Sequence, residues 1–73
     1  MKFGIVIEKT ENNFSAYVPD LPGCIATGTT KQEVLTEIID AIKFHVDGLK
    51  EDGEEIPKQK SYLNMLKLKN ITL

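Results

Sequence analysis

Hydrophobic and polar positions alternate in the first part of the chain. Every second residue is apolar over residues 3–7 and again over residues 14–18, and a polar segment at residues 10–13 separates the two. Neighbouring side chains of a β-strand point to opposite faces, so this period of two predicts two half-buried strands joined as a hairpin. Residues 19–23 contain two prolines and a glycine, which break the pattern, and a short third strand is predicted at residues 24–28.

An amphipathic helix is the clearest element, and we predict it at residues 31–52. Thr30 and Glu33 have the spacing of a capping box, in which a hydroxyl and a carboxylate satisfy free N–H groups at the helix start. Gly53 is a suitable C-terminal stop, and Pro57 follows it. At about 100° per residue, the larger aliphatic side chains share one arc of about 140°, which we expect to face the sheet. They are Val34, Leu35, Ile38, Ile39, Ile42, Val46 and Leu49.

The end of the chain carries further apolar positions after Pro57. Part of residues 61–69 is predicted to form a fourth strand, and residues 70–73 are predicted to fray. The element order is therefore β-β-β-α-β in a single domain over residues 1–73. This order is typical of the α+β class, with two layers and one helix packed on an antiparallel sheet.

The size of the chain favours self-association. A chain of 73 residues buries only about 60% of the surface that its unfolded form exposes, so its core alone stabilises it marginally. A single cysteine excludes an intrachain disulfide and fits a reducing cytoplasm. Exposed sheet edges on so small a domain tend to pair or to be covered, so we expect a homodimer or higher oligomer.

The charge balance narrows the class of partner. Nine basic and eleven acidic residues give a net charge of −2, whereas nucleic-acid binding needs a concentrated basic surface. A basic protein suits this chain better as a partner. The apolar N-terminal stretch is too short for a signal peptide or a membrane span, so we expect a cytoplasmic protein with no membrane contact.

No catalytic, metal-binding or cofactor-binding residues are predicted. Cys24 has no neighbouring base or second cysteine, which favours a small buried hydrophobe over a reactive thiol. His45 is the single histidine and lies at the edge of the apolar arc, where a packing role is expected. Metal-dependent hydrolysis needs several convergent carboxylates, and Glu8 and Asp20 have no third partner on the early strands.

Two surfaces are candidates for partner binding. On the helix, Phe44 is predicted to lie opposite the apolar arc among acidic side chains that include Glu37, Asp40 and Asp47. An aromatic side chain surrounded by charge is typical of an interface anchor, although a solvated acidic face is the simpler interpretation. In the loop, Asp20 and Leu21 belong either to a rigid turn or to a partner contact.

Three motifs, in order, resemble those of the HicB family of type II antitoxins. They are PDLPGC at residues 19–24, T-x-x-E at residues 30–33 and DGEEIP at residues 52–57. The resemblance extends from about residue 14 to residue 57. It implies a partial ribonuclease-H-like fold and a role in neutralising a HicA-type toxin, a small basic ribonuclease whose catalytic site the antitoxin masks.

The sequence departs from the family pattern after Pro57. Many members carry a C-terminal helix-turn-helix or ribbon-helix-helix domain, whereas 16 residues follow Pro57 here, so we expect no DNA binding from this chain. Two alternatives to the antitoxin role remain. One is an orphan binding module without a toxin, and the other is a weak metal-dependent nuclease on a ribonuclease-H-like scaffold. A sheet-edge nucleic-acid binder is disfavoured by the acidic balance.

Overall fold

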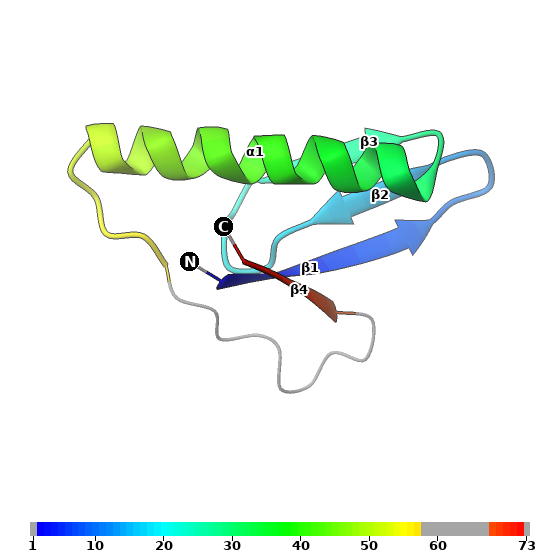
Figure 1. The fold of residues 1–73 in the computed structure, drawn as a ribbon, viewed down its shortest axis with the longest axis horizontal. Coiled ribbons are helices and arrows are strands. Elements are labelled where there is room, and N and C mark those ends of the chain that lie inside the picture. The colour runs from blue at the N-terminus through cyan, green and yellow to red at the C-terminus, as the bar shows by residue number, and fades with distance from the viewer. Residues whose placement is uncertain (1, 58–67, 73) are drawn as a thin grey trace.

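The computed structural model describes residues 2–57 and 68–72. They form two layers, in which one helix lies across one face of a four-stranded antiparallel sheet (Figure 1). The strand order in the sheet is β3-β2-β1-β4, and the order along the chain is the predicted β-β-β-α-β. The elements are β1 (Lys2–Lys9), β2 (Phe14–Tyr17), β3 (Ile25–Gly28), α1 (Lys31–Glu51) and β4 (Leu68–Thr72).

The predicted hairpin joins β1 to β2. Its register pairs Val6 with Tyr17 and Lys9 with Phe14. Thr10 closes the turn, because its backbone N–H and its hydroxyl both donate to the Asn13 carbonyl, at 2.8 and 2.9 Å. Across this hairpin, Phe3 and Ile5 of β1 and Ala16 of β2 belong to the core cluster beneath the helix.

The fourth strand lies later in the chain than predicted. β4 pairs antiparallel with β1, with Lys2 opposite Thr72 and Val6 opposite Leu68. The prediction that residues 70–73 fray is wrong for residues 70–72, because these residues pair with β1 in the sheet. Residues 61–67, on which most of the predicted strand falls, lie outside the described residues, as does residue 73.

The core forms between α1 and the sheet. The helix buries Val34, Ile38, Ile42 and Val46, all at 4% exposure or less. These side chains pack against the sheet residues Phe3, Ile5, Ala16 and Val18. Leu35, Ile39 and Leu49 are only half-buried, so the buried stripe is narrower than the predicted arc.

Both ends of α1 are capped by the predicted residues. The Thr30 Oγ1 accepts from the Glu33 N–H at 3.0 Å, while the Glu33 carboxylate accepts from the backbone N–H and the hydroxyl of Thr29. This is a capping box in which the carboxylate reaches one residue further back than usual. At the other end Gly53 has a φ of +71°, and the Glu54 N–H donates to the Leu49 carbonyl at 2.9 Å, as in a Schellman motif.

Close packing at Gly28 brings the start of the helix against the end of β3. A Cβ atom at this position would lie 2.7 Å from the backbone nitrogen of Val34. The absence of a side chain therefore allows α1 to run close to β3, which is an edge strand of the sheet. This placement creates the surface described next.

Candidate protein-interaction site

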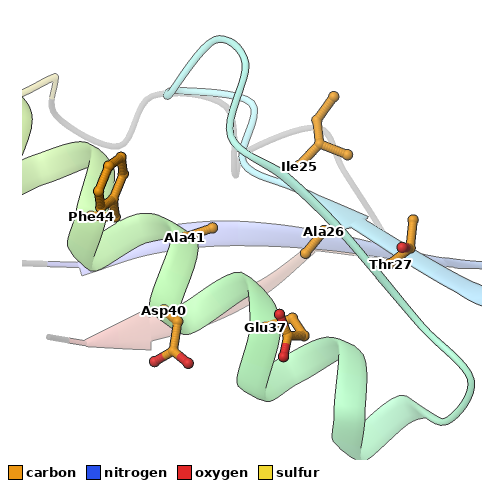
Figure 2. Close-up of a pocket in the computed structure, with 7 residues that line it drawn as sticks. All are labelled: Ile25, Ala26, Thr27, Glu37, Asp40, Ala41 and Phe44. Atoms are coloured by element: carbon orange, nitrogen blue, oxygen red, sulfur yellow. The ribbon is translucent and has the colours of Figure 1, made fainter.

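A groove lies between the edge strand β3 and the helix α1, with a volume of about 560 Å³ (Figure 2). We call it the β3–α1 groove. It is lined by Ile25, Ala26, Thr27, Glu37, Asp40, Ala41 and Phe44. Figure 2 shows the short side chains of Ala26 and Ala41 between strand and helix, with Phe44 on the helix side and Ile25 and Thr27 on the strand side.

Two large apolar side chains of the groove are exposed. Phe44 is 84% exposed and Ile25 is 64% exposed, and the structure places Phe44 on the outer part of the helix, as the sequence predicts. Full burial of such a side chain contributes about 1.5–3 kcal/mol, so leaving both in water forgoes a substantial gain in stability. Exposed apolar side chains gathered in one hollow indicate a surface for another molecule.

The groove also carries negative charge. Glu37 and Asp40 line it from the helix, and both side chains are exposed. Asp47 is exposed further along α1 but is not among the lining residues. Two carboxylates beside an exposed aromatic ring make a surface that complements a basic partner with apolar contacts.

The proline-rich loop between β2 and β3 is directed into the core. Leu21 is fully buried, at 0% exposure, and Cys24 at 3% belongs to the same core cluster. The Leu21 N–H donates to the Val18 carbonyl and the Cys24 N–H donates to the Leu21 carbonyl, both at 3.0 Å. Pro22 and Gly23, which has a φ of +84°, occupy the centre of the second turn in the pattern of type II turns.

This geometry separates the two candidate surfaces. The side chain of Leu21 packs inside the molecule and is not accessible to a partner, and Asp20 beside it is half-buried. The loop delivers the chain directly to Ile25, the first residue of β3. Its structural role is thus to set the position of the strand that forms one wall of the groove.

The remaining candidates for chemistry lie apart from one another. Burial raises the pKa of the Cys24 thiol above its ordinary value of 9.0, which keeps the thiol protonated and unreactive at neutral pH. His45 is half-buried on α1 and Glu8 is exposed on β1. Over residues 2–57 and 68–72, no group of three or more His, Cys, Asp or Glu side chains is placed to hold a metal ion. No helix in this part of the chain is long and apolar enough to span a membrane.

The strand side of the groove was missed by sequence reasoning. Alternation predicts that Ile25 and Thr27 lie on the face opposite to Cys24 and Ala26, and this much could have been read from the pattern. That β3 is an edge strand with α1 beside it depends on the strand order, which the pattern does not contain. Ala41 was not predicted to line a site, because the type and position of an alanine within a helix do not indicate a function.

The fold defines the class of protein, a small two-layer α+β domain, and the β3–α1 groove is its candidate contact surface, acidic and apolar. Comparison with family models identifies the family of the chain. The model of the HicB-like antitoxins of bacterial toxin–antitoxin systems matches residues 3–71, and the chain therefore belongs to this family. The motif resemblance in the sequence is confirmed.

The chain also has relatives among known proteins. The chain is 38% identical to an uncharacterized 14.9 kDa protein of Haemophilus phage HP1 over 96% of its own length, and it spans 55% of that protein. It is 41% identical to a UPF0150 protein of Thermoplasma acidophilum, over 80% of this chain and 86% of the relative.

Two solved structures share the fold. The N-terminal domain of the Burkholderia pseudomallei antitoxin HicB has a TM-score of 0.81 at 25% identity and covers 100% of this chain and 98% of its own. A chain of the HicA3 and HicB3 toxin–antitoxin complex has a TM-score of 0.74 at 25% identity, over 99% of this chain and 96% of its own. The predicted HicB-like α+β fold is thereby confirmed.

Proposed function

We propose that this chain is an antitoxin that binds a HicA-type toxin and masks its active site. The observation that carries the proposal is the β3–α1 groove, in which the exposed Phe44 and Ile25 lie beside the carboxylates of Glu37 and Asp40. A small basic ribonuclease would supply positive charge opposite the two carboxylates and an apolar surface that covers Phe44 and Ile25. The structural similarity to a chain from a toxin–antitoxin complex supports the same partner.

The proposed mechanism is occlusion, with no chemistry by the antitoxin. Complementary charge from Glu37, Asp40 and Asp47 accelerates the encounter, whereas burial of Phe44 sets the lifetime of the complex. We assign no catalytic residue, because the buried thiol of Cys24 stays protonated and a packed, half-buried His45 suits a structural role.

Self-association and cellular context complete the proposal. Among the described residues β3 and β4 are the edge strands of the sheet, and open strand edges favour pairing, so we propose a homodimer or higher oligomer. We also propose that the protein acts in the cytoplasm, where its single cysteine stays reduced. The net charge of −2 disfavours DNA binding by residues 1–73, because phosphate neutralisation needs a basic surface.

Co-expression tests this function directly. The chain is produced with a HicA-type toxin encoded in the same genome, and growth and co-purification are scored. We expect growth to be rescued and a stable complex to be recovered. A matched control uses the toxin with the doubly substituted chain Phe44→Ala and Asp40→Lys, for which rescue should be weaker. Absence of both rescue and complex, with both proteins folded, would contradict the antitoxin role and leave an orphan binding module.

A further inference from the structure

We propose that the open edge of β3 binds its partner by strand addition, and that the added strand alternates basic with β-branched side chains. This inference rests on the proposed function, since it names how the toxin is held. It concerns the backbone of β3 as much as the side chains of the groove. The strand order β3-β2-β1-β4 leaves one side of β3 without a neighbouring strand among the described residues.

The hydrogen-bond pattern shows which groups face the open edge. The Val18 N–H donates to the Cys24 carbonyl at 3.2 Å, which extends the β2–β3 ladder beyond the pair of Tyr17 and Ile25. Antiparallel pairs alternate between bonded and non-bonded positions. Consequently Ala26 bonds toward β2, while Ile25 and Thr27 direct their N–H and C=O groups outward.

Charged residues and proline, which commonly prevent strand addition, are absent from β3. Natural edge strands are protected by shortness, lysines, prolines, bulges or a covering segment, and β3 has the first of these features, with four residues. Residues Ile25–Gly28 contain no charged residue and no proline, and Ile25 is 64% exposed. An edge without charge or proline is suited to receive a short strand from another chain.

The groove beside this edge determines which side chains the added strand carries. Successive side chains of a strand point to opposite faces. Those on the helix side enter the β3–α1 groove, where Ala26 and Ala41 leave room and Glu37 and Asp40 supply negative charge. A lysine or arginine fits there, because its aliphatic stem packs on the alanines and its cation meets the carboxylates and the Phe44 ring. Those on the other face lie beside Ile25, where a β-branched side chain packs well.

Repulsion between carboxylates disfavours the pairing of β3 with the β3 strand of a second copy of this chain. Two β3 strands paired across a two-fold axis would bring both α1 helices onto one face at the junction. Glu37 and Asp40 of one copy would then approach the same residues of the other, which is repulsive. The proposal therefore assigns the β3 edge to a basic partner and leaves the β4 edge for self-association.

A peptide probe tests the strand chemistry without the toxin. An eight-residue capped peptide of alternating lysine and valine is titrated into the full chain and followed by amide chemical shifts. We expect changes at Ile25–Gly28 and at the groove positions of α1. A matched peptide with glutamate in place of lysine should cause none. Equal changes with both peptides, or changes elsewhere only, would overturn the inference.

Variants then test the edge in the toxin complex. Thr27→Pro removes an outward N–H that β2 does not use, and proline is tolerated on edge strands, so the fold should persist and the affinity should fall about tenfold. Thr27→Val keeps the N–H and should therefore weaken binding less than Thr27→Pro does. Asp40→Lys should weaken binding about tenfold, whereas Glu51→Lys, with the same charge change outside the groove, should not.

The outcomes separate this inference from the antitoxin proposal. If the chain binds toxin but Thr27→Pro and Asp40→Lys bind as tightly as the unmodified chain, strand addition is wrong while the antitoxin role stands. If the basic peptide binds β3 but no toxin is neutralised, the antitoxin role is wrong while the edge chemistry stands. If Thr27→Pro lowers the oligomeric mass of the protein alone, β3 is an interface between copies and the inference is overturned. Should Thr27→Pro fail to fold, Asp40→Lys against Glu51→Lys decides the question.

Discussion

The β2–β3 loop and the β3–α1 groove are neighbours along the chain but play opposite parts in the structure. The loop holds the most conspicuous motif of the sequence, yet it turns inward and buries Leu21 at 0% exposure. The groove is lined by Ile25, the residue after Cys24, and by Phe44 of the helix, and both side chains are exposed to water. The difference shows that a distinctive motif can serve to position a neighbouring strand by packing in the core rather than to form an exposed surface.

The largest effect on stability is expected for Leu21→Ala. The substitution leaves a cavity in the core cluster, and such changes lower the free energy of unfolding by about 2–5 kcal/mol. Chemical denaturation measures the loss. The matched control is Ile25→Ala, which truncates an aliphatic side chain that is 64% exposed and should change stability by about 0.5 kcal/mol or less. Equal losses of unfolding free energy at the two positions would show that the loop and the groove contribute alike to stability.

A smaller effect is expected for Gly28→Ala, which tests the packing that forms the groove. The new methyl group would lie 2.7 Å from the Val34 nitrogen, so strand and helix must separate at a cost of about 1–3 kcal/mol. Gly48→Ala is the control, because a Cβ there meets nothing within 4 Å and should raise stability by up to about 1 kcal/mol. Thermal unfolding compares the two, and a neutral Gly28→Ala would show that the close approach is not required.

The loop should also make stability depend on pH through Cys24. Burial raises the pKa of the folded Cys24 thiol above 9.0, so the unfolded chain loses this proton first. Stability from this group is fully present below pH 9 and is lost as the pH rises through the folded-state pKa. Denaturation at pH 7 and pH 10 should therefore show a larger fall for the unmodified chain than for Cys24→Ala. Equal falls would mean that the thiol is not shielded.

The smallest effect on stability is expected for Phe44→Ala, whose side chain is 84% exposed. The free energy of unfolding should change by about 0.5 kcal/mol or less, while the affinity for the toxin should fall about tenfold or more because a buried aromatic anchor is lost. Calorimetric titration measures the affinity, and Lys43→Ala, an exposed neighbour outside the groove, is the control. Unfolding of Phe44→Ala would show that the ring belongs to the core.

Several local features could be predicted because their causes lie within a few residues. The period of two over residues 3–7 and 14–18, the Thr30 cap and the Gly53 stop each depend on neighbouring side chains and backbone geometry. The exposure of Phe44 follows from the same helical periodicity. Of the side chains predicted to contact a partner, Glu37, Asp40 and Phe44 line the groove and Leu21 lies in the core; that a partner binds at the groove stays a prediction.

The sequence by itself determined the element order, the helix ends and the side of the helix that faces water, because all of these follow from short-range periodicity and capping. Only the tertiary structure decided that β3 is an edge strand, that β4 pairs with β1 at Leu68–Thr72, and that Ala26 and Ala41 meet Phe44 in one hollow. Strand order and groove shape arise from contacts between residues far apart in the chain. No local pattern encodes those contacts, so the β3–α1 groove forms only when the layers pack.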